Sequence, residues 1–292
     1  MENSSIHPTA ITIALAFIIL VFAVIMWGGC SYRLYMHSLG REMGKAGTML
    51  QTAGLPEIKG RYFIVKYYPG DKEQAQMVLQ AAEKFIQPVS QKLKYTPRGK
   101  EIIIVYPTRE KLNAYFGWPA DESAMGVYWA GTIRVLAPRE WVDTEDGREA
   151  WNKFVNSGPM AHEIAHLVVD HRTKGNYNRW FTEGVAQYVE LELTGFRFRD
   201  PAGSLENNRY SLQQLSDNFD RLPNQSLAYR QSLAAVYYLV HRYGEDSLVE
   251  IMDLLAEGAA LDQALQKVCR LNLPDFENKL NDWLDKNWSM FS

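Results

Sequence analysis

Apolar positions along the chain predict strands in its first half. The predicted strands are Arg61–Tyr68, Glu101–Tyr106, Met125–Trp129 and Thr132–Leu136. They are rich in β-branched and aromatic residues, and Gly or Pro bounds most of them. Asp71–Leu93, between the first two, has instead the apolar spacing of a helix. A short turn at Ala130–Gly131 would join the last two strands as a hairpin.

Helical spacing replaces the strand pattern from Glu145 onward. It continues through Leu227–Arg242, Glu245–Glu257 and from Leu261 to the end of the chain. Strands followed by helices predict an α+β fold rather than a parallel α/β sheet. The interpretation is a small N-terminal sheet followed by a mostly helical part.

A long apolar run lies near the N-terminus. Ile11–Trp27 contains seventeen residues without a charge, which at about 1.5 Å per residue nearly matches a hydrocarbon core of about 30 Å. It predicts one transmembrane helix over about 10–27. A cleaved signal peptide would need a basic leader, which the first nine residues lack. The stretch before Cys30 resembles a lipoprotein cleavage site only loosely, and a buried soluble helix is a further alternative.

The apolar run divides the chain into two parts. Residues 1–54 are expected to be a tail, a transmembrane helix and a stalk, because Ser31–Ala53 is polar and shows no clean apolar stripe. Residues 55–292 form the predicted globular domain. Its strand-rich part covers 55–144 and its helical part covers 145–292.

Composition narrows the possible partners. The formal net charge is −3, with 31 basic and 34 acidic residues, so the chain lacks the positive field of a nucleic-acid-binding protein. Only Cys30 and Cys269 are present, too few for a disulfide framework or a cysteine-built zinc site. Any metal must therefore be bound by His, Asp or Glu.

One motif carries candidate chemistry. His162, Glu163 and His166 form the pattern His-Glu-x-x-His, after a Pro159 that suits a first helical turn. Residues four apart lie on one face of a helix, so both imidazoles can reach one metal ion. The plainer alternative is two histidines that satisfy hydrogen bonds in a half-buried helix.

A second helical segment strengthens the metal interpretation. Trp180–Tyr188 reads WFTEGVAQY and follows a polar turn, which would return Glu183 towards the first helix. His-Glu-x-x-His followed by Trp-x-x-Glu-Gly-x-Ala-x-Tyr resembles the gluzincin zinc peptidases, and most of all their peptidase MA-like members. The resemblance covers about Pro159–Glu190. The spacing from His166 to Glu183 is slightly shorter than in thermolysin, which leaves the register of the third ligand open.

The resemblance implies a zincin-like fold, a Zn²⁺ cofactor and a peptide or protein substrate. It assigns His162, His166 and Glu183 as zinc ligands and Glu163 as the general base. Three protein ligands leave one coordination position open, as hydrolytic zinc sites require. A structural zinc site would normally be closed by a fourth ligand, and a tethered binding module would be expected to lack an active residue, so both are weaker alternatives.

Residues around the motif have several possible roles. Glu190 lies about 10 Å along the helix axis from Glu183, too far for the same ion, and is expected at the surface or behind the ligands. Gln187 would either accept a hydrogen bond from His162 or face solvent. Asp170 is a weaker candidate for supporting the ligands, and His171 is expected at the surface.

The group that stabilises the oxyanion is less determined. Tyr229, Tyr237 and His241 are candidates, and Tyr229 comes first because Tyr-Arg-Gln-Ser resembles a recurrent feature of the peptidase MA-like family. Tyr237 could instead be a core aromatic. The strands over Met125–Leu136 correspond in order to the gluzincin edge strand that binds extended peptides.

Two arguments about membrane orientation conflict. Arg33, Arg41 and Lys45 all follow the apolar run, and the positive-inside tendency would place the domain in the cytoplasm. Glu42 partly offsets this small bias, and the family resemblance favours the other side. The expectation is a single-pass membrane protein whose catalytic domain lies outside the cytoplasm.

Overall fold

The computed structural model describes residues 29–120 and 124–291. The strands are β1 Glu57–Lys59, β2 Phe63–Tyr67, β3 Glu101–Tyr106, β4 Gly126–Trp129 and β5 Thr132–Leu136. The helices of the first half are α2 Gly29–Gln51, α3 Lys72–Lys92, α4 Arg109–Phe116 and α5 Gly147–Ser157. Those of the second half are α6 Met160–Thr173, α7 Arg179–Thr194, α8 Leu212–Asn218, α9 Gln225–Tyr243, α10 Glu245–Ala256, α11 Leu261–Cys269 and α12 Leu273–Asn287.

The five strands form one mixed sheet in the order β1-β2-β3-β5-β4. The three central strands are parallel, and β1 and β4 pair antiparallel at the two edges. Helix α3 connects β2 to β3, which is the kind of crossover that parallel neighbours need. All six residues of β3 are buried, as expected for a central strand covered on both faces.

Helix α3 covers one face of the sheet and α4 lies against the other. The apolar side of α3, including Val78, Phe85 and Ile86, joins the main core with Phe63 and Val65 of β2. Leu112 of α4 packs in a smaller cluster with Ile102 and Ile104. Successive β3 side chains therefore point into different clusters, as the alternation of a strand requires.

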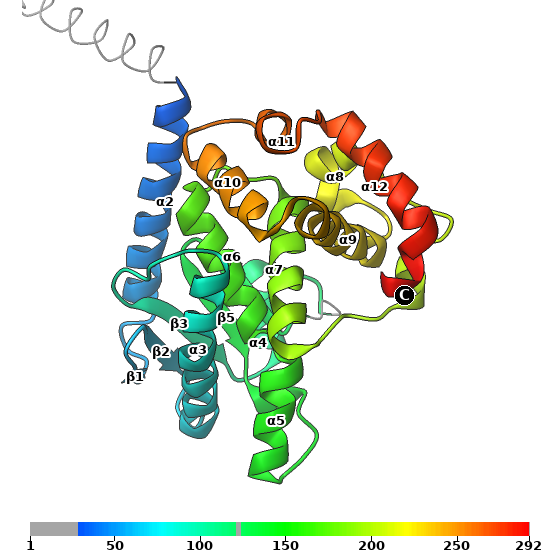
Figure 1. Ribbon diagram of the computed structural model, residues 1–292. Coiled ribbons are helices and arrows are strands. Elements are labelled where there is room, and N and C mark those ends of the chain that lie inside the picture. The colour runs from blue at the N-terminus through cyan, green and yellow to red at the C-terminus, as the bar shows by residue number, and fades with distance from the viewer. Residues whose placement is uncertain (1–28, 121–123, 292) are drawn as a thin grey trace, which may run out of the picture.

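The helical half is built around α6 and α7, which lie side by side in the middle of Figure 1. Helix α7 packs in turn on α9, and α10 and α12 also contact α9. The close approach depends on Gly184, because a Cβ there would lie 2.3 Å from the Ser232 carbonyl oxygen. This packing fixes the two helices that carry the candidate motif.

The structure confirms the mixed α+β class, with the sheet first and the helices afterwards. The four predicted strands and the helix after Asp71 are present almost at their expected boundaries. Three strands are parallel, however, because α3 connects β2 to β3, and α4 followed by the edge strand β4 leads from β3 to β5. The three-residue strand β1 and helix α4 escaped prediction. Helix α6 begins after Pro159 with no side-chain cap.

The segment expected to be a stalk is a helix that packs on the globular part. Helix α2 lies along the left edge of the molecule in Figure 1. Arg41 and Lys45 on this helix form ion pairs with Asp170 and Glu101. The predicted transmembrane run Ile11–Trp27 lies outside the described residues, and no helix within 29–120 and 124–291 is long and apolar enough to cross a membrane.

Candidate metal centre

Helices α6 and α7 bring the three predicted ligands together. His162 and His166 lie one turn apart on α6, and their Nε2 atoms are 3.0 Å apart. Glu183 of α7 places Oε2 3.3 Å from His162 Nε2 and 3.4 Å from His166 Nε2. Among the described residues, these three are the group of His, Cys, Asp or Glu that could share a metal ion.

The triangle of ligand atoms has the size that zinc requires. Tetrahedral zinc with bonds of about 2.0–2.2 Å to nitrogen and oxygen separates its ligand atoms by about 3.3–3.5 Å. The observed separations are 3.0, 3.3 and 3.4 Å. The donor set, two imidazoles and one carboxylate, is also that of hydrolytic zinc sites. The residues therefore fit a zinc ion.

Buried carboxylate oxygens support the same conclusion. Glu183 is 1% exposed and Glu163 is 5% exposed. Oε2 of each has no hydrogen-bond donor among the described residues. Buried polar atoms are rarely left without a partner, so a bound cation or water would satisfy each of these oxygens.

The outer nitrogen of each histidine contacts a residue of α7. Glu190 Oε2 lies 3.3 Å from His162 Nδ1, and Thr182 Oγ1 lies 2.7 Å from His166 Nδ1. An acceptor at Nδ1 holds the proton there and leaves Nε2 free for a metal. Glu190 was expected either at the surface or behind the predicted ligands. It is buried, and it lies behind His162.

Gln187 does not contact His162. Its side-chain amide donates to the backbone oxygens of Glu183 and Tyr229, so it links α7 to α9. The prediction of a contact between Gln187 and His162 was wrong because Gln187 turns towards α9. Glu190, about one turn further along α7, contacts His162 instead.

Electrostatics keeps the Glu183 carboxylate ionised. Burial alone would raise the pKa of Glu183, but His166, Arg179 and His162 together hold that pKa well below its usual range. Arg179 Nη2 lies 3.0 Å from Glu183 Oε1, so the carboxylate's other oxygen remains for the metal. Burial lowers the pKa of His166, which favours the neutral imidazole that binds metals.

Glu163 of the motif lies against the edge strand β4. Burial, with a smaller contribution from Glu183, raises the pKa of Glu163 to about 7. The backbone N–H of Tyr128 donates to this carboxylate. The approach depends on Gly126, because a Cβ there would lie 2.9 Å from Glu163 Cγ. A carboxyl group with a pKa near neutrality is suited to accept and return a proton.

A cleft of about 770 Å³ opens onto the motif. One side is formed by the backbone of β4, the free edge of the sheet. Trp129 and Phe198, both more than half exposed, contribute apolar surface. An edge strand beside a buried carboxylate provides a place for an extended chain to pair by backbone hydrogen bonds.

Tyr229 is the candidate oxyanion donor that lines this cleft. The Glu183 charge, followed by burial, raises its pKa above the usual range, so the phenol stays protonated. Arg179 hydrogen bonds to Tyr229 and also lies 3.5 Å from Asp220. Tyr229 is therefore held beside the ligand carboxylate.

The two other candidates lie elsewhere. Tyr237 stacks on His241 with ring centroids 3.8 Å apart and also contacts Trp283 and Phe291. Among the described residues, those that line the cleft include neither Tyr237 nor His241. Tyr237 belongs to the aromatic packing of the C-terminal helices, as its alternative interpretation predicted.

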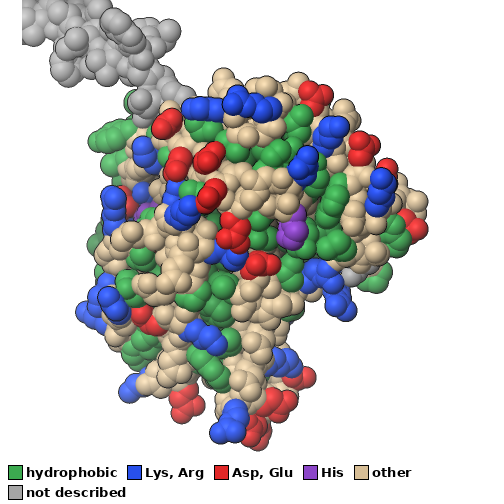
Figure 2. Space-filling model, in the orientation of Figure 1, with side chains coloured by type: hydrophobic (Ala, Val, Ile, Leu, Met, Phe, Trp, Pro, Cys, Tyr) green, Lys and Arg blue, Asp and Glu red, His purple; other side chains and the backbone are tan. Residues whose placement is uncertain are grey.

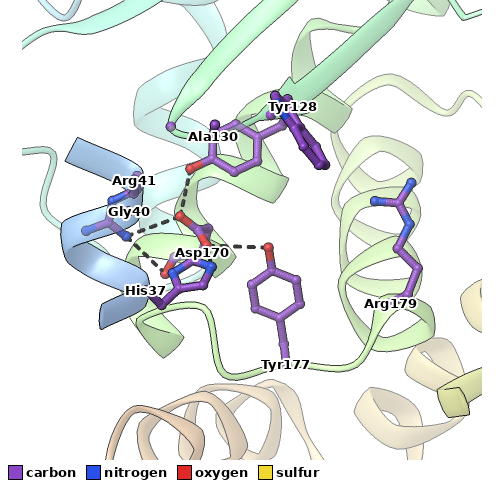
Figure 3. A pocket seen from close by; sticks show the side chains of 10 residues that line it. His37, Gly40, Arg41, Tyr128, Ala130, Asp170, Tyr177 and Arg179 are labelled. Carbon is purple, nitrogen blue, oxygen red and sulfur yellow. Dashed lines mark hydrogen bonds and ion pairs between the residues drawn. The ribbon is translucent and has the colours of Figure 1, made fainter. Parts of the chain in front are cut away.

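The hydrogen bonds of Asp170 go to side chains other than the predicted zinc ligands (Figure 3). They join α6 to α2, to β4 and to the segment before α7. Asp170 Oδ2 accepts hydrogen bonds from Tyr128 at 2.7 Å and from Arg41 at 3.1 Å. Tyr177 Oη lies 3.4 Å from Oδ1, and His37 Nε2 lies 3.6 Å from it. These side chains line a second cavity of about 330 Å³ between α2, the β4–β5 turn and α6.

His171 is not a surface histidine. Its side chain is 14% exposed, its Nε2 lies 3.3 Å from Glu101 Oε1, and its ring packs beside Tyr95. Burial, with smaller contributions from Arg41 and Lys45, lowers the pKa of His171 to about 4. The position was misassigned because docking of α2 covers it.

Sequence reasoning missed Thr182, Arg179 and Tyr128. Thr182 and Arg179 precede Glu183 by one and four positions, so each lies beside the ligand on α7. Helical spacing from Glu183 would have indicated Arg179. Nothing in the local sequence indicates Tyr128, whose partner lies 42 positions away.

Of three comparisons with known proteins, the one with protein-family models agrees with the motif. The model of the Peptidase MA superfamily matches residues 144–286, which confirms the family resemblance. A comparison with curated proteins gives no match. Among solved structures, an M1 zinc metallopeptidase from Deinococcus radiodurans is 15% identical with a TM-score of 0.41, over 79% of this chain and 50% of that chain.

A mutant form of the M1 enzyme from the same organism, bound to a Tyr-Ser-Ala substrate, is similar to the same degree. It is 14% identical with a TM-score of 0.39, again over 79% of this chain and 50% of that chain. The chain thus spans about half the length of the solved structures that it matches.

Proposed function

We propose that this chain, whose residues 144–286 belong to the Peptidase MA superfamily, is a membrane-anchored zinc-dependent peptidase. The observation that carries the proposal is the zinc-sized triangle of His162, His166 and Glu183, with Glu163 buried beside it. Ligands and base come from adjacent helices, and a cleft leads to them.

The protein's contribution to hydrolysis is orientation and proton transfer. His162, His166 and Glu183 would hold the ion, and zinc bound there supplies a Lewis acid that polarises a water and the scissile carbonyl. Glu163 holds the water, accepts its proton and returns it to the leaving amine. Its pKa of about 7 suits both transfers.

The substrate in this proposal is an extended peptide. The backbone of β4 pairs with it, and Trp129 and Phe198 cover apolar side chains. Tyr229 donates a hydrogen bond to the developing oxyanion, supported by Arg179. Nucleic acid is not a proposed partner.

Membrane anchoring and orientation also belong to the proposal. Ile11–Trp27 provides the single span, and the catalytic part lies outside the cytoplasm. Protease added to intact cells should then digest residues 61–292. If they remain intact until the membrane is permeabilised, the orientation is the reverse.

Glu163→Gln is the decisive variant. Its turnover of a fluorogenic peptide library should fall by about 10²–10⁴-fold, the usual contribution of general acid–base catalysis. Bound zinc should stay near one per chain, because Glu163 is not a ligand. Glu183→Ala should lose the zinc itself. Wild-type turnover in Glu163→Gln would refute the assigned base, and stoichiometric zinc with no turnover of the wild type would favour a silent binding module.

A further inference from the structure

Helix α2 has two opposite faces. The side chains that face the domain are Leu34, His37, Arg41, Lys45 and Thr48. At about 100° per residue these positions share one side of the helix. This docked face is mostly polar, and its charges pair with Asp170 and Glu101. The apolar side chains of α2 must therefore lie elsewhere.

The apolar stripe of α2 lies on the opposite side and is exposed. The stripe consists of Tyr32, Met36, Leu39, Met43, Ala46 and Leu50, all exposed. Met43 is 66% exposed and Leu50 is 79% exposed. Most of the large exposed hydrophobic residues in the described parts of the chain lie on this one helix. In Figure 2, hydrophobic side chains gather at the left edge of the molecule, where α2 lies in Figure 1.

The spacing of the stripe fits a second helix as its partner. Successive members are four, three, four, three and four positions apart. This alternation is the heptad repeat that packs one helix against another in a coiled coil. The stripe runs for about 27 Å, at 1.5 Å per residue.

We propose that the stripe binds the same stripe of a second copy of this chain, as a parallel two-helix coiled coil. The apolar run Ile11–Trp27 ends two residues before α2 begins. Two copies anchored in one membrane would place identical helices side by side, parallel and at the same height. The parallel arrangement rests on the anchoring proposed above, whereas the heptad stripe does not depend on it.

The residues beside the stripe favour this pairing. The stripe contains no charged residue, so its centre meets no like charge in a symmetric pair. In a parallel pair, Glu42 would lie opposite Gly47 of the second copy, five positions further on. A Cβ at Gly40 or Gly47 would touch nothing within 4 Å. This surface is therefore open, and two helices can approach closely along it.

Cysteine cross-linking of the full-length chain in membranes tests the pairing. Leu39→Cys belongs to the stripe, and Ser38→Cys, a neighbour about 100° around the helix, is the matched control. Both are made with Cys30→Ser, and Cys269 is buried. In a parallel coiled coil, equal positions of the stripe face each other across the seam, close enough for a disulfide, which needs a Cα separation of about 4.4–6.8 Å. Leu39→Cys should form a disulfide-linked dimer and Ser38→Cys should not. Equal cross-linking, or none at Leu39→Cys, would overturn the proposal.

A charge in the stripe provides the second measurement. In detergent, the protein mass of Met36→Glu with Met43→Glu should fall from two chains to one chain of 33.5 kDa. Ser38→Glu should remain dimeric. Met36 and Met43 face away from the domain, so thermal melting of this double variant should show that the domain is still folded. A wild-type monomer whose charged variant binds vesicles less well would instead make lipid the occupant and refute the dimer. Carbonate extraction reports separately whether the chain is anchored.

Discussion

Removing Glu190 tests how the residue behind His162 supports metal binding. Outer partners of metal-bound histidines contribute about 10–100-fold to affinity. Glu190 Oε2 lies 3.3 Å from His162 Nδ1, which is longer than the 2.7–2.9 Å of a strong charge-assisted hydrogen bond. We therefore expect Glu190→Ala to weaken zinc binding by about tenfold, or about 1.4 kcal/mol.

The assay is competition for zinc with a chromophoric chelator at pH 7.5. Glu192→Ala is the matched control, because it removes a carboxylate from the same helix that pairs with Lys92 rather than with a histidine. Its zinc affinity should equal that of the wild type. Glu190→Gln keeps an acceptor for Nδ1 and should lose less than Glu190→Ala.

Two outcomes would refute the reasoning. A loss in Glu190→Ala as large as in Glu183→Ala would make Glu190 a ligand and move the register of α7 by two turns. An affinity equal to that of Glu192→Ala would mean that the Nδ1 contact does not orient His162.

Three further variants test other contacts. Tyr229→Phe should lower kcat by about 10²-fold with zinc content unchanged, as loss of one oxyanion donor does, and an unchanged kcat would remove Tyr229 from the mechanism. Arg41→Gln leaves Asp170 buried without the Arg41 cation and should lower the free energy of unfolding by about 3 kcal/mol. A loss below about 0.5 kcal/mol, the size of an ordinary surface substitution, would contradict the ion pair. Because the folded pKa of His171 is about 4, its contribution to stability is complete above pH 6.5 and is lost as the pH falls towards 4. Urea unfolding should show the wild type losing about 2 kcal/mol more than His171→Gln between pH 7.5 and pH 5, and equal losses would place His171 in solvent.

The sequence predicted the elements whose local signals agree with their burial. Strand β3 was placed correctly because it is apolar throughout, is buried on both faces and ends at a proline. Helices α6 and α7 followed from the spacing of the metal motif. The three-residue strand β1 has too few positions for a period to emerge.

The sequence did not reveal which contacts reach across the fold. Glu190 was judged too far along α7 from Glu183 to bind the same ion. The group that could hold an ion among the described residues does not include Glu190. Gln187 was named as a partner for the second nitrogen of His162, but Glu190, two turns after Glu183, contacts that nitrogen instead. Contacts of this kind depend on how α6 crosses α7, which no local pattern encodes.

Helix α2 was misinterpreted for a different physical reason. A surface helix normally turns its apolar face inward, whereas α2 turns charged residues towards the domain and its apolar stripe outward. This stripe was overlooked in the sequence, and a stalk was therefore predicted. The division at residue 55 remains a prediction, but the contacts of α2 bear on it. A chain that began at Leu55 would bury Asp170 and Glu101 without Arg41 and Lys45. Since Asp170 also holds Tyr128 of the edge strand that lines the cleft, α2 stabilises the substrate side of the proposed active site as well as the domain surface.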